Sequence, residues 1–165
     1  MNKFLLSAPL CIVSFVSYAQ QLSVKELLLF CGQDSQTTND YLVTKGWTFN
    51  GVGKGVKTAA SRLEANGSWK FKKSGYPDGI AANIQISQHS NGKREVIYIT
   101  ASKRYYDIAK QELFNFNAEK IYSWTEDDCL RSKYKALKNG VFVCNIGICK
   151  WTDFPAAYTI GVAYY

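Results

Sequence analysis

The segment "IAANIQISQHSNGKREVIYIT", residues 80–100, contains the clearest structural pattern in the chain. Apolar and polar residues alternate in "IAANIQISQ" and again in "REVIYIT", with the period of two that a strand with two different faces produces. Between them, "HSNGK" holds Asn91-Gly92, a typical pair for a tight turn between antiparallel strands. The segment therefore predicts a β-hairpin in which Ile97 and Ile99 face away from Tyr98.

Helices are expected before and after this hairpin. Ser102 can begin the strongest one, in which apolar residues recur at helical spacing: Tyr105, Ile108, Ala109, Leu113 and Phe116. An earlier helix is predicted in "VKELLLFC", after a capping box at residues 23–26. A weaker helix is predicted in "DYLVTK", where Gly46 stands at the position of a C-terminal glycine.

The remaining segments predict further strands. These are "WTFNG", "SWKFKK", "EKIYSW", "RSKYKAL", "GVFVCN" and "AYTIGVAYY", with turns at Asn66-Gly67 and Asn139-Gly140. "VKTAASRLE" fits a strand or a helix, and its neighbours favour a strand. The order is helix then strands, twice, in halves 22–100 and 101–165. We predict an α+β fold of two tandem helix-plus-antiparallel-meander units, with the helices packed on one face of an antiparallel sheet.

The first residues, "MNKFLLSAPLCIVSFVSYAQQ", have the layout of a secretory signal peptide. Lys3 precedes a mostly apolar run at 4–16 that is too short to span a bilayer. Ser17 and Ala19 are small residues at the −3 and −1 positions of a cleavage site. We expect a signal peptide at 1–19, cleavage after Ala19, a periplasmic or secreted location, and one α+β domain at 20–165.

Two alternatives to a cleaved signal peptide stay open. Cys11 could carry a lipoprotein anchor, although the bulky Leu10 before it departs from the small residue expected there. An uncleaved anchor is less favoured because no basic cluster follows directly. No other stretch is long and apolar enough to cross a membrane, so no stable membrane insertion is expected.

The chain is basic, with 20 Lys and Arg against 13 Asp and Glu and a formal net charge of +7. A basic balance favours anionic partners. Outside the cytoplasm these are anionic glycans, lipid head groups or acidic proteins rather than nucleic acid. The basic residues are scattered, and "KFKK" at 70–73 is the densest cluster, so plain solubility is an equal explanation of the charge.

Signal removal leaves an even number of cysteines in an oxidising compartment, which favours disulfides: Cys31, Cys129, Cys144 and Cys149. In "VFVCNIGICKW" the spacing is neither the C-x2-C of a zinc site nor that of a redox pair. A turn at Ile146-Gly147 would set Cys144 opposite Cys149, and a longer loop is the alternative. Of the three pairings, we predict 144–149 together with 31–129.

Aromatic residues make up 15% of the chain, and the alternating strands place rings on both faces. Tyr and Trp among Lys and Arg are typical of the centre of a binding surface, and the same rings can stack on sugars. For each ring the alternative is burial under a helix. The candidate binding residues are Trp69, Tyr98, Tyr122, Trp124, Tyr134 and Trp151.

No recognisable catalytic set occurs, so we expect a protein that is not an enzyme and uses no cofactor or metal. His89, the only histidine, lies in the predicted turn, where a solvated role is the usual one. "GVGKG" at 51–55 lacks the spacing of a phosphate-binding loop. The carboxylates Glu126, Asp127 and Asp128 form a cluster that could hold calcium weakly, but a solvated loop is favoured.

The layout resembles the β-lactamase-inhibitor-protein architecture: a secreted chain of similar length with tandem helix-plus-four-strand units and a stapled hairpin. The likeness covers most of the chain after the signal, as a pattern without matching motif residues. The chain also resembles the small exported proteins, with a signal that ends in "AQ", of Bacteroidetes-type bacteria. These resemblances imply a protein-binding module that uses a concave sheet, although fold alone does not establish function.

We therefore expect an exported inhibitor or immunity-type protein. It would neutralise a cell-envelope effector, such as a toxin, or an enzyme by occluding it. The alternative is a glycan- or peptidoglycan-binding module that uses Trp69, Trp124 and Trp151 as stacking platforms.

Overall fold

The computed structural model describes residues 21–53, 63–73, 75, 79–137, 142–151 and 154–164. The helices in these ranges are α1 (Val24–Gly32), α2 (Ser35–Thr44) and α3 (Lys103–Asn115). Four strands precede α3: β1 (Thr48–Gly53), β2 (Leu63–Lys72), β3 (Ile80–His89) and β4 (Arg94–Thr100). Four strands follow it: β5 (Glu119–Glu126), β6 (Cys129–Ala136), β7 (Phe142–Trp151) and β8 (Phe154–Tyr164).

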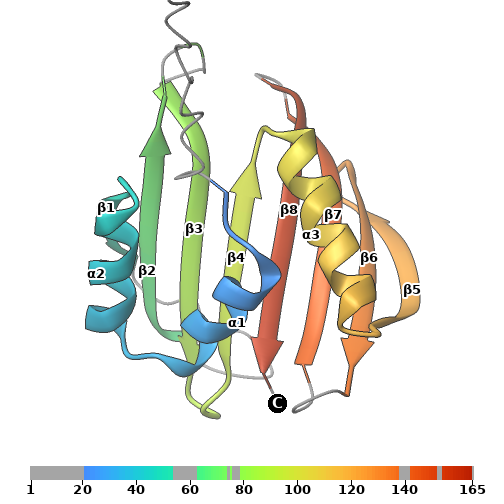
Figure 1. The fold of residues 1–165 in the computed structure, drawn as a ribbon, viewed down its shortest axis with the longest axis horizontal. Coiled ribbons are helices and arrows are strands. Elements are labelled where there is room, and N and C mark those ends of the chain that lie inside the picture. Colours follow the sequence, from blue (N-terminus) through green and yellow to red (C-terminus); the bar gives the residue numbers. More distant parts are fainter. Residues whose placement is uncertain are drawn as a thin grey trace, which may run out of the picture.

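The strands form one sheet in the order β1-β2-β3-β4-β8-β7-β6-β5, and every neighbouring pair is antiparallel. The expected mixed α+β class is therefore confirmed, with the sheet as its larger part. The strands β4 and β8, which are distant in sequence, meet in the middle of the sheet (Figure 1). The edges are β1 and β5.

The hairpin predicted at residues 80–100 is confirmed. β3 and β4 pair in antiparallel register, with Ile84 opposite Tyr98. Gly92 has φ 78°, and its N–H donates to the carbonyl of His89 at 2.9 Å. Only a residue that tolerates positive φ fits this turn, which explains the Asn-Gly pair. His89 is the last residue of β3 rather than part of the turn.

The helices begin close to the predicted positions. Ser23 and Glu26 form the expected capping box, in which the Ser23 hydroxyl accepts from the Glu26 N–H at 3.1 Å. α2 begins earlier than predicted because Asp34 caps it and accepts from the Thr37 N–H at 2.9 Å. In α3 the buried side chain of the first turn is Tyr106, not Tyr105.

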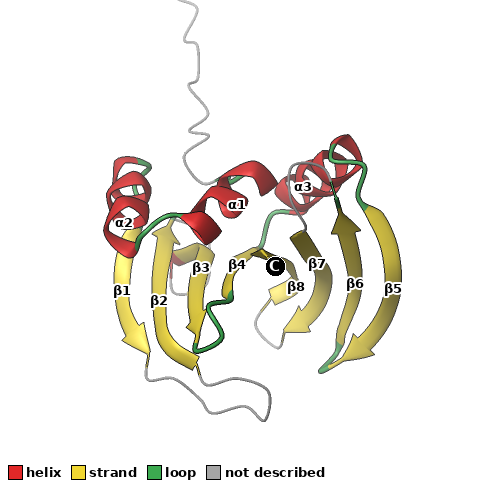
Figure 2. Cartoon of the chain, turned by 90° about the horizontal axis from the view of Figure 1, so that it is seen from below, coloured by secondary structure: helices red, strands yellow, loops and turns green. Residues whose placement is uncertain are grey.

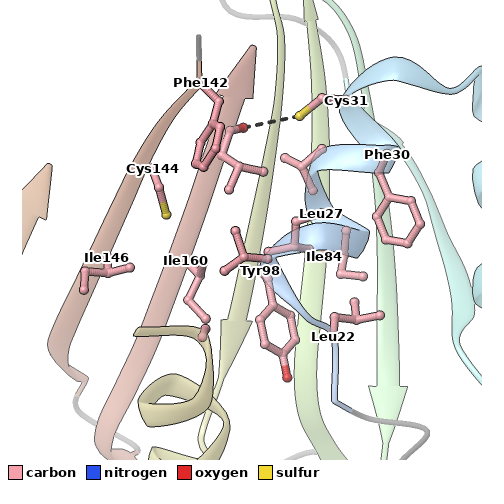
Figure 3. Close-up of a cluster of buried hydrophobic side chains, with 14 of the residues drawn as sticks. Leu22, Leu27, Phe30, Cys31, Ile84, Tyr98, Phe142, Cys144, Ile146 and Ile160 are labelled. Atoms are coloured by element: carbon pink, nitrogen blue, oxygen red, sulfur yellow. Dashed lines mark hydrogen bonds between the residues drawn. The ribbon is translucent and has the colours of Figure 1, made fainter. Parts of the chain in front are cut away.

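One face of the sheet carries the main hydrophobic core. α1 packs against β4 and β8, and so does α3 (Figure 2). Alternate residues of the central strands point toward these helices and are fully or almost fully buried: Ile84, Val96, Tyr98, Cys144, Ile146, Ile160 and Val162. Leu27 and Phe30 of α1 meet this layer in Figure 3. We call this side the covered face.

Two predicted turns lie inside strands. Asn66-Gly67 belongs to β2, and Ile146-Gly147 belongs to β7, which runs without a break through that pair. A Cβ at Gly67 would lie 2.9 Å from the ring of Trp69, which covers this glycine. Glycine in a strand can mark such a close approach instead of a turn. Asn139-Gly140 and most of "VKTAASRLE" lie outside the described residues.

The predicted disulfide pairing is wrong. The structure joins Cys129 of β6 to Cys149 of β7, which face each other directly in the register. Cys31 and Cys144 are free and buried. Cys144 and Cys149 lie an odd number of residues apart in the continuous strand β7, so their side chains lie on opposite faces of the sheet. Cys31 in α1 and Cys129 are likewise separated by the sheet.

Both free thiols belong to the core (Figure 3). The Cys31 thiol donates to the Val162 carbonyl, with a sulfur–oxygen distance of 3.6 Å. Burial raises the pKa of Cys31 to about 11, despite the nearby Arg94 charge, and burial also raises the pKa of Cys144. Both groups are therefore thiols at neutral pH and have little nucleophilic character.

Candidate functional site

The opposite face of the sheet presents the alternate residues of the same strands, and we call it the open face. Ile97 and Ile99 of β4 are partly exposed there, on the side opposite to Tyr98, as the alternation predicts. β8 contributes small residues, with Gly161 opposite Ile97 and Thr159 opposite Ile99. Small side chains beside two isoleucines leave a low, apolar centre in the sheet.

The open face contains a hollow of about 290 Å³. Its lining includes Ile97, Ile99, Thr159 and Gly161 in the middle, with polar side chains around them. Cys129, Cys149 and Ala157 form a small apolar cluster at one end, against which Ile99 packs. The disulfide therefore ties together two strands that form part of this surface.

Gly147 controls how closely side chains approach each other beside the hollow. It lies between Arg131 of β6 and Thr159 of β8 in the register. A Cβ at Gly147 would lie 2.6 Å from the Thr159 hydroxyl and 3.3 Å from Cγ of Arg131. Because Gly147 has no side chain, the aliphatic part of Arg131 and the Thr159 hydroxyl can lie close to its backbone. This packing holds Arg131 beside the hollow.

Aromatic and basic side chains alternate across β5 and β6 at the edge of the open face. Tyr122 pairs with Lys133, and Trp124 pairs with Arg131. The two rings lie 5.2 Å apart, and the Lys133 ammonium lies 5.7 Å from the Tyr122 ring centre, within cation–π range. We call these four residues the aromatic edge.

Glu126 closes the aromatic edge at the end of β5. Its carboxylate accepts from the Trp124 indole N–H at 3.3 Å and lies 3.7 Å from a nitrogen of Arg131. These contacts orient the indole and the guanidinium without removing them from solvent. The Tyr122 side chain is 49% exposed, so its ring can contact a partner directly.

Three of the predicted binding residues lie in the core. Tyr98 is completely buried, Trp69 is 3% exposed and Tyr134 is 6% exposed. These rings lie in the helix-packed layer, so they are not on the open face and cannot contact a macromolecular partner there. Burial raises the pKa of Tyr134, and the neighbouring Cys144 adds to this effect. Trp151 ends β7, and its side chain lies outside the described residues.

Tyr122 and Trp124 are the predicted binding residues that the structure brings together on accessible surface. The sequence interpretation missed Arg131, Thr159 and Gly161 of the hollow, and Gly147 beside it. The alternation of "RSKYKAL" contained a usable signal, since Arg131, Lys133 and Lys135 all lie on the face away from the buried Tyr134. Which of the two faces the helices cover depends on packing between segments distant in sequence.

The other candidate groups occupy structural positions. His89 lies 4.0 Å from Glu95 across the start of β4. Asp127 and Asp128, with φ 46° and 57°, form the tight turn between β5 and β6. Within the described residues, no group of three or more His, Cys, Asp or Glu side chains could hold a metal ion. None of the described helices is both long and apolar enough to cross a membrane.

Comparisons with known proteins give no relative for this chain: no family model, no curated protein and no solved structure matches it.

Proposed function

We propose that this protein is an exported binding module of the inhibitor or immunity type, which occludes a protein partner with its open face. The partner would be a cell-envelope effector or enzyme with an acidic contact surface. The protein would act by binding, without a cofactor or a chemical step of its own.

The aromatic edge beside the hollow supports this proposal most directly. Tyr, Trp and Arg are the residues that most often dominate the binding energy of protein interfaces. Here Tyr122, Trp124, Arg131 and Lys133 are adjacent on a rigid sheet, and Glu126 holds two of them in place. A partner side chain could enter the apolar hollow, while carboxylates of the same partner could reach Arg131 and Lys133.

Export and fold duplication are part of the same proposal. We propose that residues 1–19 are a signal peptide cleaved after Ala19. We also propose that the two halves are tandem units of the β-lactamase-inhibitor-protein type, with helices over one face. The strand order supports this, because each half supplies four consecutive strands and the last strand of each half meets the other at β4 and β8. The N-terminal residue of the exported protein would test the cleavage site.

A pull-down tests the binding function. The purified, oxidised protein is immobilised and exposed to envelope extracts of the producing cell and of neighbouring species. We expect one protein to be retained at about equal molar amount and to be lost with Trp124→Ala or Tyr122→Ala. Phe114→Ala is the matched control, because Phe114 is 53% exposed but lies on α3. Equal loss with Phe114→Ala would contradict the proposed face.

Glycan binding is the second candidate. The adjacent rings of Tyr122 and Trp124 are the observation that favours it, since paired rings can stack on sugars. Retention of soluble wall fragments or an anionic polysaccharide, without a dominant protein and again dependent on Trp124, would select this function.

A further inference from the structure

A second cavity, of about 460 Å³, lies between α2 and the sheet, on the side opposite to the open face. Its walls come from β1 to β4, and the first residues of α2 lie over it. In Figure 1, α2 stands beside the β1 and β2 edge. A volume of this order fits a small ligand. The proposed binding to a macromolecule on the open face gives this cavity no role.

The cavity exists because of a glycine and a tryptophan. In the register, Gly67 lies between Val52 and Ile86, and it has no side chain of its own, which leaves room for the Trp69 ring. The Trp69 ring extends toward this glycine and forms a wall, with Phe49 at 5.2 Å between ring centres. The Trp69 indole N–H donates to the Asn39 side-chain oxygen at 3.1 Å, which fixes α2 above the cavity.

Arg94, at the start of β4, provides the only cationic side chain in the lining of this cavity within the described part of the chain. One terminal nitrogen, Nη1, donates to the carbonyl of Gln33. Nε and Nη2 are buried and have no hydrogen-bond partner. These two nitrogens share one edge of the guanidinium plane, which is the edge that binds a carboxylate through two parallel hydrogen bonds.

The charge of Arg94 is also only partly compensated. No carboxylate among the described residues lies within ion-pair distance of it. Asp34 is nearby, but both of its oxygens are used at the start of α2, accepting from the Thr37 N–H at 2.9 Å and its hydroxyl at 2.6 Å. Desolvation lowers the pKa of Arg94, although Cys31 and Asp34 oppose this effect. Unpaired buried donors of this kind are costly to leave without an acceptor.

We propose that this cavity binds a small organic acid, with its carboxylate on Nε and Nη2 of Arg94 and its apolar body against Trp69, Phe49 and Ile86. A single guanidinium matches a monoanion, and the apolar walls match an aromatic or medium-length aliphatic group. Inorganic phosphate lacks that group and would leave the walls without a partner.

Calorimetric titration of the purified protein with 3-phenylpropionate and octanoate tests this site, with neutral 3-phenylpropanol as the matched control. We expect saturable binding of at least one acid and about tenfold weaker binding of the alcohol, because the alcohol cannot accept two charge-assisted bonds. Arg94→Gln should weaken acid binding by a similar factor. Arg94→Lys should restore part of it, since lysine keeps the charge without the planar fork. Arg131→Gln on the open face should leave it unchanged.

A second pair of variants separates binding from folding. Val52 is 70% exposed at the mouth of the cavity, so substitutions there should leave the fold intact. Val52→Glu should bind the acid several-fold more weakly than Val52→Gln, because its carboxylate repels an anion. The proposal is overturned by equal binding of the acid and the alcohol, by binding of inorganic phosphate alone, by an Arg94→Gln variant that binds normally, or by no saturable binding of either acid.

Discussion

The two faces of the central strands are formed by alternate residues of the same segments, but one face is buried and the other is partly exposed. On the covered face, Tyr98 of β4 lies in a layer with Ile84 and Ile160 and has no exposed surface. One residue away on each side, Ile97 and Ile99 point to a hollow with glycine and threonine as neighbours. Tyr98 packs in the core on the covered face, whereas Tyr122 on the open face is accessible. The same residue type therefore has a different role on each face of the sheet.

Matched tyrosine truncations give the largest contrast. Tyr98→Ala should lower the free energy of unfolding by about 3–5 kcal/mol, because it removes a fully buried ring from a packed layer. Tyr122→Ala should change it by no more than about 0.5 kcal/mol, since the ring is half exposed at an edge strand. Urea unfolding measures both. Similar losses for the two variants would contradict the assignment of the faces.

The disulfide should stabilise the folded protein by about 3 kcal/mol, the value expected for a loop closed between cysteines with a sequence separation of 20. The double variant Cys129→Ala, Cys149→Ala should show that loss in urea unfolding. Single removal would leave a reactive thiol and is a poorer comparison.

Thiol chemistry separates the cysteines of the two faces. Without reductant, the native protein should react very slowly with an alkylating reagent, because Cys31 and Cys144 are buried. After unfolding, both should react, and peptide mapping should show a bond between Cys129 and Cys149. A mapped bond between Cys144 and Cys149 would contradict the continuous β7 strand.

Gly147 tests the construction of the open face. Gly147→Ala should cost about 1–3 kcal/mol, because the added methyl group would collide with Thr159 and press on the Arg131 stem. Gly161→Ala is the control, since a Cβ there would make only ordinary contacts of 3.8 Å or more. Equal stability of the two variants would show that the close approach over Gly147 is unimportant.

Two glycines, Gly67 and Gly147, show the limit of what the sequence alone could predict. The alternation in residues 80–100 and the Asn91-Gly92 pair between its two parts were sufficient to predict the hairpin and the opposite directions of Ile97 and Tyr98. Gly67 and Gly147 resembled turn residues, but each one is a site where a side chain from the same or a neighbouring strand covers the backbone. At Gly147 the covering side chains, Thr159 and Arg131, are distant in sequence, and the segment around the glycine gives no direct sign of them. The disulfide error followed from the assumed turn at Gly147.

Two ion pairs, one on each side of the sheet, should differ in their contribution. The Glu26 side chain is 18% exposed and accepts from Tyr41 of α2 and from Lys45, the residue after this helix. Burial raises the Glu26 pKa, but hydrogen bonds from Lys45, Ser23 and Tyr41 outweigh it, so the pKa lies below its ordinary value of 4.5. Its stabilisation is therefore present above about pH 4.5 and is lost as the pH falls through the folded-state pKa.

Glu26→Gln should accordingly cost about 1 kcal/mol at pH 7 and almost nothing in strong acid. Glu126→Gln, on the exposed pair with Arg131, should cost less than about 0.5 kcal/mol at either pH. Urea unfolding at pH 7 and at pH 2.5 measures the difference. A loss for Glu26→Gln that is independent of pH would exclude the proposed charge effect.

The smallest expected effect is at the turn beside the disulfide. Asp128 has φ 57°, and the second central position of such a hairpin turn favours glycine. Asp128→Gly should raise the free energy of unfolding by about 0.5 kcal/mol, because it relieves the left-handed conformation of a residue with a side chain. A lower midpoint in urea would show that the Asp128 carboxylate makes a contribution larger than this strain.

Hydroxyl-radical footprinting of the protein, free and bound to the partner that the pull-down retains, would show which face of the sheet binds. We expect oxidation of Tyr122 and Trp124 to fall strongly in the complex, while oxidation of Phe114 on α3 and Phe49 on β1 stays unchanged. Protection of Phe114 or Phe49 with no change at Tyr122 and Trp124 would contradict the open face as the binding surface.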